Sequence, residues 1–258
     1  MTTSFPFTSA LVTGASSGIG EAMVELLGGA GIPTVVVARR ADRLEELAGR
    51  FDDVEVLAAD LTTKKGLAAV VARVGDAALP IDLVVNNAGF GTSGEFHALD
   101  SDRLDREVQL NVAALTRLSH AALAAMVPRG RGYLLNVSSV ASFQPAPKLA
   151  VYAATKAYVT SLTESLHEEV RGTGVHVTAL CPGLTRTEFQ SVSNSDDYAG
   201  QYPTFVWLES REVAQAGLDD VARGKALSVP GLMYKGMVTG SSIMPRGLAR
   251  RLASLVQR

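Results

Sequence analysis

The stretch ALVTGASSGIG, residues 10–20, joins a short apolar run to a segment with helical spacing of apolar residues through a glycine-rich turn. Gly14, Gly18 and Gly20 lack the Cβ atoms that would keep the backbone away from a pyrophosphate group. The helix that follows presents unpaired N–H groups and a partial positive charge at its start. The stretch therefore predicts a site for a phosphate-bearing ligand, although an ordinary tight turn can have the same glycine content.

Short apolar runs alternate with helical segments along the rest of the chain. This alternation is typical of a parallel sheet with crossover helices, and the Val-rich and Leu-rich runs suit strands that are buried on both faces. We expect strands at residues 10–12, 34–38, 54–58, 83–86, 132–137, 175–180 and 226–229. The predicted fold class is a doubly wound α/β sheet of seven mostly parallel strands, with helices on both faces.

The segments between these strands have the apolar spacing of helices. We expect helices at residues 20–30, 42–50, 63–75, 102–126, 152–173 and 211–223. Asp42 and Asp102 are the expected N-cap residues of two of them, and Gly172 with Gly174 would end the fifth.

No repeat, heptad series or Pro/Gly/Ser linker divides the chain, so we expect one domain over residues 1–258. The polar, irregular stretch at residues 188–203 follows the sixth strand, at the edge where open α/β sheets bind ligands, and we expect a substrate lid over about residues 188–210. Residues 231–258 form a C-terminal extension whose last part, 246–257, has the pattern of a basic amphipathic helix. That helix either packs on the body of the protein or contacts a partner.

Composition argues against several kinds of protein. Hydrophobic residues make up 47% of the chain and charged residues 19%, as in globular proteins. The net charge of -2 lacks the basic excess that binding to nucleic acid or an anionic membrane requires. The N-terminus has neither the basic segment of a signal peptide nor the unbroken apolar run of a membrane span. Cys181, the one cysteine, is interpreted as structural and allows no internal disulfide, so we expect a cytoplasmic protein.

The second expected strand ends in Arg39 and Arg40, where dinucleotide-binding folds recognise the adenosine ribose. An acidic residue there would accept hydrogen bonds from the ribose hydroxyls of NAD and would repel the 2′-phosphate of NADP. Guanidinium groups instead form forked, charge-assisted hydrogen bonds with phosphate oxygens. The pair therefore favours NADP(H) over NAD(H), unless both arginines are simply solvated surface residues. Asp60, after the third strand, either accepts a hydrogen bond from the adenine amino group or caps a helix.

Asn86-Asn87-Ala88-Gly89 follows the fourth strand. Its small residues allow a ligand to approach closely, and its asparagine side chains can bridge neighbouring loops. An asparagine-rich turn without a ligand is equally compatible with this stretch.

Tyr152 and Lys156 open an expected helix, and their separation of four residues puts them on one face. A free tyrosine has a pKa of about 10, which an adjacent ammonium lowers by stabilising the phenolate. The pair alone is common on helices. The sequence adds Ser138 and Ser139 at the end of the fifth strand, where a hydroxyl can bind a substrate oxygen, and Asn111 within the fourth helix.

In this order, the motifs resemble those of the short-chain dehydrogenase/reductase family: TGxxxGxG at residues 13–20, NNAG at 86–89, a helical Asn111, Ser139, and YxxxK at 152–156. The resemblance covers roughly residues 8–190 and implies a Rossmann-type fold. It further implies that Tyr152 is the general acid in reduction and the base in oxidation, and that Ser139 orients the substrate oxygen. Lys156 would hold the nicotinamide ribose and tune Tyr152, and Asn111 would support a proton-relay water.

The segment Pro182-Gly183-Leu184-Thr185-Arg186-Thr187 resembles the part of the family fold that surrounds the nicotinamide carboxamide. Thr187 would bind the carboxamide or the phosphates. The cofactor contacts that we expect are Gly14, Ser16, Ser17, Gly18, Ile19, Gly20, Arg39, Arg40, Asp60, Leu61, Asn87, Ala88, Gly89, Tyr152, Lys156, Pro182, Gly183, Thr185 and Thr187. No metal site is expected.

These patterns together predict an NADP(H)-dependent reductase of ketones or aldehydes, with NAD(H) as a weaker cofactor and a small carbonyl or alcohol compound as substrate. The alternatives are an NAD-linked alcohol dehydrogenase and a non-catalytic dinucleotide-sensing or scaffold protein with the same fold. Phe90, Phe143, Phe189 and Tyr202 suggest an apolar lining for the substrate pocket.

We also expect a homodimer or a homotetramer. The C-terminal extension departs from relatives that end in a glycine-rich, tetramer-forming segment. Its Tyr234, Met237, Ile243 and Met244 would cover the active-site rim, form a dimer contact or pack as ordinary core residues.

Overall fold

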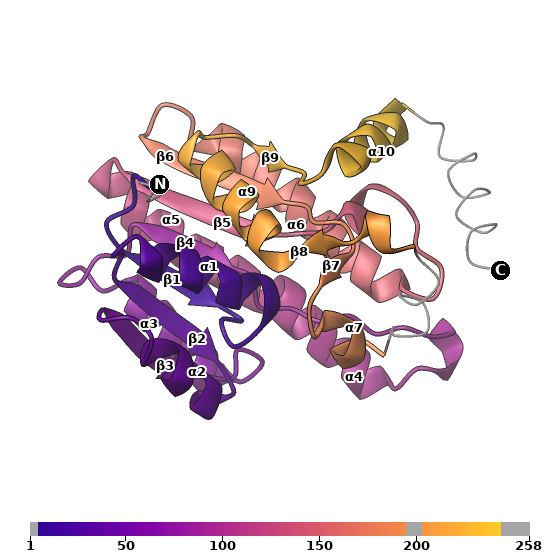
Figure 1. The fold of residues 1–258 in the computed structure, drawn as a ribbon, viewed down its shortest axis with the longest axis horizontal. Coiled ribbons are helices and arrows are strands. Elements are labelled where there is room, and N and C mark those ends of the chain that lie inside the picture. Colours follow the sequence, from indigo (N-terminus) through magenta and orange to yellow (C-terminus); the bar gives the residue numbers. More distant parts are fainter. Residues whose placement is uncertain (1–4, 195–202, 244–258) are drawn as a thin grey trace.

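A parallel sheet of seven strands runs through the centre of the protein (Figure 1). The computed structural model describes residues 5–194 and 203–243. The strand order is β3-β2-β1-β4-β5-β6-β9, and every neighbouring pair is parallel. The strands are β1 (Ala10–Thr13), β2 (Thr34–Ala38), β3 (Val54–Ala58), β4 (Leu83–Asn86), β5 (Gly132–Val137), β6 (Val175–Leu180) and β9 (Leu227–Ser228). The predicted fold class is thereby confirmed, with the last strand shorter than expected.

Alternate residues of the central strands contribute to two separate cores, because successive side chains of a strand point to opposite faces of the sheet. In β1, Ala10 and Val12 belong to one core and Leu11 to the other. The first core lies beneath α1 (Gly18–Gly29), α2 (Ala41–Ala48) and α9 (Ser210–Ala222). The second lies beneath α3 (Lys64–Val74), α5 (Leu115–Arg129) and α6 (Ala150–Glu169). In Figure 1, α1 and α9 lie side by side on one face of the sheet.

The strand order places the functional loops together. β1 pairs with β2 on one side and with β4 on the other, so the chain order reverses at β1. Open α/β sheets bind ligands in the crevice beside the carboxyl ends of the strands at such a point. The turn after β1 and the Asn-rich turn after β4 both lie there.

The helix expected at residues 102–126 is divided into three parts. They are α4 (Ser101–Val108), a π-helical segment (Gln109–Ala114) and α5. Asp100 caps α4, because its Oδ1 accepts a hydrogen bond from the Asp102 N–H at 3.0 Å. The expectation that Asp102 is the N-cap is therefore wrong, since the cap lies two residues earlier.

The start of α2 and the end of α6 also differ from the sequence predictions. The N-cap of α2 is Arg40. Asp42 lies inside the first turn, where the positive end of the helix dipole stabilises its negative charge. The expectation for Asp42 is therefore also wrong. α6 ends at Glu169, and Gly172 and Gly174 follow it with φ values of 81° and 79°, which glycine adopts without strain.

The continuous helical stretch Ser101–Arg129 is long and apolar enough, by length and composition alone, to cross a membrane. Leu118, Ala122 and Met126 in this stretch are buried in the second core. Packing against the sheet accounts for its apolar character.

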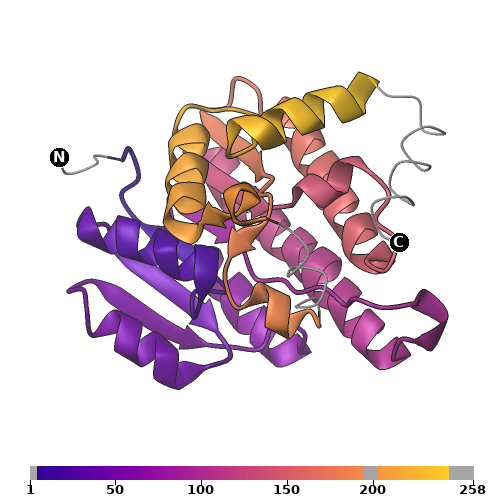
Figure 2. The ribbon, with the colours of Figure 1, turned by 45° about the vertical axis from the view of Figure 1, so that its right-hand side comes forward.

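The segments after β6 are more regular than the sequence predicts. β7 (Thr185–Arg186) and β8 (Leu208–Glu209) form a small parallel sheet. The expected lid contains α7 (Phe189–Val192) and a 3₁₀ turn (Thr204–Val206). The sequence patterns do not predict α10 (Leu232–Ile243), the yellow helix at the top of Figure 2. The helix expected at 246–257 lies outside the described residues.

Candidate functional site

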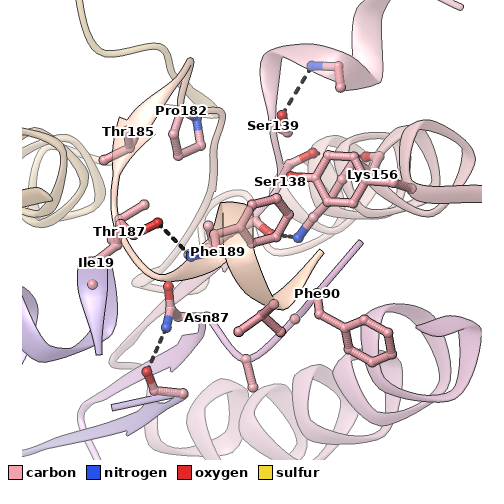
Figure 3. A pocket seen from close by; sticks show the side chains of 18 of the residues that line it. Ile19, Asn87, Phe90, Ser138, Ser139, Lys156, Pro182, Thr185, Thr187 and Phe189 are labelled. Atoms are coloured by element: carbon pink, nitrogen blue, oxygen red, sulfur yellow. Dashed lines mark hydrogen bonds between the residues drawn. The ribbon is translucent and has the colours of Figure 1, made fainter. Parts of the chain in front are cut away.

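A cavity of about 900 Å³ lies at the carboxyl edge of the sheet. Residues that follow six successive strands, β1 to β6, line it. All but one of the expected cofactor contacts belong to this lining, together with Ser139. The exception is Gly20, and the expected catalytic Asn111 also lies outside the lining. Figure 3 shows residues of α1 and of the segments after β4, β5 and β6 gathered around the pocket.

The glycine turn has the backbone that its sequence predicts. Gly14 and Gly18 have φ values of 66° and 61°, in the left-handed region that glycine tolerates. A Cβ on Gly18 would lie 2.8 Å from the Thr187 side chain, so the turn and the Thr187 segment approach each other closely. A Cβ on Gly20 would collide with the Gly14 carbonyl, which shows that Gly20 is needed for packing beneath the turn.

Asn87 joins the turn after β4 to the turn after β1. Its amide Nδ2 donates to the Thr13 carbonyl at 2.9 Å and to the Gly14 carbonyl at 3.2 Å. The Thr13 hydroxyl accepts from the backbone N–H groups of Asn87 and Ala88. The bridging role expected for Asn87 is present, and it fixes the shape of the crevice.

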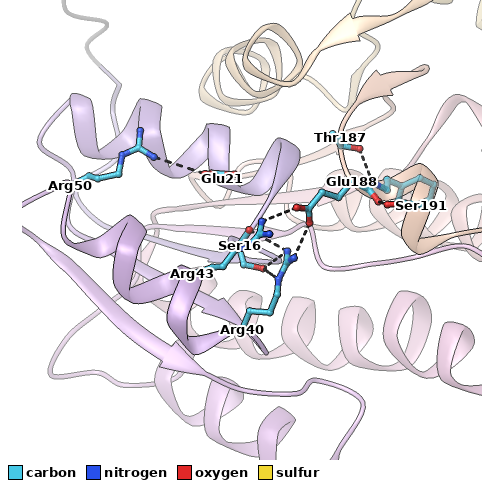
Figure 4. A network of polar contacts seen from close by, with 9 residues as sticks. Ser16, Glu21, Arg40, Arg43, Arg50, Thr187, Glu188 and Ser191 are labelled. Atoms are coloured by element: carbon cyan, nitrogen blue, oxygen red, sulfur yellow. Dashed lines mark hydrogen bonds and ion pairs between the residues drawn. The ribbon is translucent and has the colours of Figure 1, made fainter. Parts of the chain in front are cut away.

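The two arginines after β2 differ. Arg39 is exposed, whereas the Arg40 guanidinium donates to Ser16 through Nε at 3.2 Å and Nη2 at 3.0 Å. Arg40 Nη1 also contacts Glu188 at 2.8 Å, and Arg43 Nη1 contacts the other oxygen of Glu188 at 2.7 Å (Figure 4). Arg43 and Glu188 are not among the residues that the sequence motifs single out. Arg43 follows Arg40 by three residues, which is the spacing of neighbours on a helix.

The helix-cap role considered for Asp60 is wrong, because Thr63 is the N-cap of α3 and its hydroxyl accepts a hydrogen bond from the Gly66 N–H at 3.0 Å. The adenine contact stays a prediction for Asp60. The Asp60 Oδ1 accepts hydrogen bonds from the backbone and hydroxyl of Thr62 at 2.9 and 2.7 Å, and the carboxylate lines the cavity. Hydrogen bonds from Thr62 and the charge of Arg39 outweigh partial burial and hold the pKa of Asp60 below its usual value. The carboxylate is therefore ionised and faces the same space as Arg39.

Ser138 and Ser139 have different surroundings. The Ser138 hydroxyl is buried and donates to the Lys156 carbonyl at 2.8 Å, in agreement with a structural role. The Ser139 Oγ accepts from the Ala141 N–H at 3.1 Å. This bond occupies an acceptor position of Ser139 and leaves its hydroxyl proton able to donate.

Tyr152 and Lys156 lie one turn apart near the start of α6, with Lys156 Nζ 5.7 Å from the centre of the Tyr152 ring. Burial raises the pKa of Tyr152 to about 12, although the neighbouring Ser139 hydroxyl lowers it. Burial lowers the pKa of Lys156 to about 8. The expectation that Lys156 brings the tyrosine pKa down is therefore not met in the protein alone, because desolvation dominates at both groups.

Asn111 lies in the π-helical segment and is almost fully buried. Its Nδ2 donates to the Phe90 carbonyl at 2.8 Å and to the Thr155 hydroxyl at 3.1 Å, and its Oδ1 accepts from the Phe90 N–H. A Cβ on Gly89 would lie 3.0 Å from Asn111 Oδ1 and 3.5 Å from Lys156 Nζ. The Asn111 side chain thus clamps the loop after β4 to α6, directly beside Lys156.

Glu107, one turn before Asn111, is a buried carboxyl that the motifs do not single out. Burial raises its pKa to about 7, against the lowering effect of the Thr92 hydroxyl and of the charges on Arg103 and Lys156. Neither carboxylate oxygen has a partner at hydrogen-bonding geometry within the described part of the chain.

Several aromatic side chains surround the tyrosine. The Phe189 and Tyr152 rings lie 5.3 Å apart, and Phe90 lines the same cavity. Phe143 packs instead in a small core with Tyr234 and Val238 of α10. Tyr234 and Met237 reach the cavity from α10. Tyr202, Met244 and the Ile243 side chain lie outside the described residues.

Comparison with known proteins agrees with this geometry. The family model for short chain dehydrogenases matches residues 8–198. An uncharacterized oxidoreductase of Staphylococcus aureus is 31% identical over 222 residues, which cover 85% of this chain and 93% of that protein.

Two solved structures are similar over almost their whole length. A short-chain dehydrogenase from Sphingobium yanoikuyae in complex with NADPH has a TM-score of 0.81 and 35% identity, with 92% of this chain and 96% of that chain covered. The bulky-bulky ketone specific alcohol dehydrogenase from Comamonas testosteroni has a TM-score of 0.77 and 31% identity, with 93% and 95% covered.

Proposed function

Since this chain belongs to the short-chain dehydrogenase family and is an oxidoreductase, we propose that it transfers hydride between NADP(H) and a ketone, an aldehyde or the corresponding alcohol. One observation carries the proposal: Ser139, Tyr152 and Lys156 line the same cavity as the glycine turn and Arg40. The nicotinamide supplies the hydride when it is bound.

Tyr152 is the proposed proton donor to the substrate oxygen during reduction. With a pKa of about 12 the phenol is protonated at neutral pH, so a proton is present for transfer to the substrate oxygen. Ser139 donates a second hydrogen bond to the same oxygen, because the Ala141 N–H already occupies one of its acceptor positions. Two donors at one oxygen stabilise the negative charge that develops there.

Lys156 and Asn111 support the proton donor. Lys156 Nζ donates to the Val137 carbonyl at 2.8 Å, which fixes the ammonium at the end of β5. An ammonium has three N–H donors, so others remain for the cofactor ribose. The Asn111 side chain is occupied by Phe90 and Thr155, so we assign the proton-relay water to its backbone carbonyl in the π-helical segment.

The residues present fit a phosphorylated dinucleotide. Added Cβ atoms at Gly14 and Gly18 would close the turn against Ala88 and Thr187, so the cradle depends on glycine. We propose that Ser16, Arg40 and Arg43 hold the 2′-phosphate and that Asp60 accepts a bond from the adenine amino group. The NADPH complex of the Sphingobium relative supports this preference.

The substrate is proposed to be a ketone with bulky apolar substituents. The cavity lining includes Phe90, Leu149, Val192 and Met237 besides Phe189, whose ring lies 5.3 Å from that of Tyr152. These side chains offer apolar surface and few hydrogen-bond donors, which favours substituents without polar groups. The ketone specificity stated for the Comamonas relative supports the same class.

The test is the oxidation of NADPH across a series of ketones, aldehydes, quinones and 3-oxoacyl thioesters. Tyr152→Phe should abolish turnover and leave NADPH binding largely intact. Tyr158→Phe is the matched control, because Tyr158 lies on the same helix with its hydroxyl bonded to Thr116 at 2.9 Å and is partly exposed. Undiminished turnover by Tyr152→Phe would overturn the catalytic assignment.

The two alternatives give different results in the same assay. An NAD-linked alcohol dehydrogenase would bind NADH as tightly as NADPH. A dinucleotide-sensing or scaffold protein would bind NADPH and turn over none of the substrates.

We also propose a homodimer or homotetramer located in the cytoplasm. Among the large apolar side chains of the described residues, Phe205 and Leu232 are the most exposed, at 78% and 86%, and we propose Leu232 as a subunit contact. Sedimentation analysis of the wild type and of Leu232→Ser would show whether Leu232 lies between subunits.

A further inference from the structure

Two arginines converge on a single carboxylate across the cofactor crevice. Arg40 and Arg43, at the start of α2, each contact one oxygen of Glu188, at 2.8 and 2.7 Å (Figure 4). Glu188 lies 148 residues after Arg40, in the segment that follows β7. The ion pairs therefore tie the cofactor side of the crevice to the segment that covers the catalytic residues.

The geometry around Arg40 resembles an occupied anion site. Its Nε and Nη2 donate to Ser16 Oγ, and Nη2 also contacts the Ser16 carbonyl at 3.2 Å. Nη1 is directed to the Glu188 carboxylate. A phosphate monoester offers more charge and more acceptor oxygens than a carboxylate to the same fork of donors.

The ion pairs are of a kind that a ligand can displace. The side chains of Arg40, Arg43 and Glu188 are 40%, 46% and 40% exposed, so water competes for each contact. The two arginines hold the pKa of Glu188 below its usual value, which keeps the carboxylate charged. Glu188 is thus charged at neutral pH, and solvent exposure weakens its ion pairs with the two arginines.

The residues beside Glu188 contact both halves of the site. Thr187 lies against Gly18 of the glycine turn. Phe189 packs on Tyr152 with ring centres 5.3 Å apart. Further along, the Ser193 hydroxyl accepts from the Gly91 N–H at 2.9 Å. A shift of Glu188 would move a segment that covers the tyrosine.

We propose that Glu188 is an internal competitor for the anion site formed by Ser16, Arg40 and Arg43, so that the 2′-phosphate of NADP(H) binds by displacing Glu188 and thereby repositions segment 187–193 over Tyr152. The proposal rests on the proposed use of NADP(H). In this proposal, binding of the 2′-phosphate moves segment 187–193, whereas NAD(H), which lacks this phosphate, leaves the Glu188 ion pairs intact.

The first test compares dissociation constants of NADPH and NADH for the wild type and Glu188→Gln. The variant should bind NADPH roughly 3- to 10-fold more tightly, because no ion pair has to be broken, and its NADH affinity should stay within about 2-fold. Glu21→Gln is the control, because it removes a negative charge nearby without releasing Arg40 or Arg43. An equal gain in Glu21→Gln, or no gain in Glu188→Gln, would overturn the proposal.

The second test follows the segment itself. Trp207 is the only tryptophan, and its ring lies 5.9 Å from the Arg186 guanidinium, two residues before Glu188. Adenosine 2′,5′-bisphosphate, which has no nicotinamide to absorb the emission, should change Trp207 fluorescence in the wild type, and ADP should not. Glu188→Gln should show the changed emission without ligand.

Adenosine 2′,5′-bisphosphate and ADP together distinguish a failure of the proposed NADP(H) preference from a failure of the proposed Glu188 displacement. If the wild type binds the bisphosphate no better than ADP, the proposed NADP(H) preference fails. If it binds the bisphosphate better and Trp207 emission is unchanged in both proteins, the preference stands and the displacement of Glu188 is refuted.

Discussion

The hydroxyl of Tyr234 accepts a hydrogen bond from the Leu184 N–H at 3.0 Å and donates one to the Val206 carbonyl at 2.9 Å. Leu184 belongs to the segment expected to surround the nicotinamide, and Val206 ends the 3₁₀ turn before β8. A side chain of the C-terminal extension therefore joins two loops of the cofactor crevice. The C-terminal extension therefore helps to hold the cofactor crevice in shape.

Removal of this hydroxyl should cost stability. Tyr234→Phe keeps the buried ring but leaves the Leu184 N–H and the Val206 carbonyl without this partner, which we expect to lower the free energy of unfolding by about 1–3 kcal/mol. Urea denaturation measures the change. Tyr158→Phe, which loses a hydroxyl on a partly exposed ring, should change it by less than about 1 kcal/mol. Equal losses in both variants would show that the Tyr234 bridge is unimportant.

Gly183 should not tolerate a side chain, although its backbone needs no unusual φ. A Cβ there would overlap the Tyr234 ring, so Gly183→Ala should destabilise the protein by about 1–3 kcal/mol through overpacking. Gly236→Ala is the control, because no atom lies near the added methyl and alanine favours a helix interior; it should be neutral or stabilising by up to about 1 kcal/mol. Thermal unfolding of both variants measures the difference, and a Gly183→Ala protein as stable as the wild type would contradict the packing argument.

The sequence predicts the sheet well because its strands are Val-rich and Leu-rich runs bounded by turns, such as residues 34–38. It also predicts that Gly14, Asn87 and Ser139 share one edge, since the carboxyl ends of parallel strands meet there. These conclusions need only local patterns and one rule of topology.

No local sequence pattern predicts the contacts between loops that are far apart in the chain. Glu188 meets Arg40 across 148 residues, and Tyr234 reaches Gly183 from a helix that sequence patterns do not predict. The raised pKa of Tyr152 is a property of burial, which the YxxxK spacing does not contain. Arg43 is the residue that a closer use of helical spacing could have identified.

Glu107 should give the protein an unusual pH dependence. Its pKa is about 7 in the folded protein and ordinary in the unfolded chain, so the folded state binds more protons between these values. Its contribution to stability is fully present below the unfolded pKa and is lost as the pH rises through about 7. Glu107→Gln cannot lose a proton. Its free energy of unfolding, relative to that of the wild type, should therefore rise by up to roughly 3 kcal/mol between pH 4.5 and pH 8.

Urea denaturation at the two pH values measures this gain. Glu46→Gln, on the exposed side of α2, is the control and should show no such change. The same stability difference at both pH values for Glu107→Gln would contradict a carboxyl that titrates near neutrality.

Lys156 should set the alkaline limit of catalysis. Because burial lowers its pKa to about 8, the ammonium carries its charge below this pH and loses it above. The value of kcat/KM for NADPH reports groups of the free enzyme, so it should be level below about pH 8 and fall about tenfold per pH unit beyond it. Tyr152, with a pKa of about 12, stays protonated throughout and cannot produce this fall. In Lys156→Arg, whose guanidinium keeps its charge, the decline should disappear whatever activity remains. A wild-type profile that stays level to about pH 10 would show that the charge of Lys156 is not needed to bind NADPH.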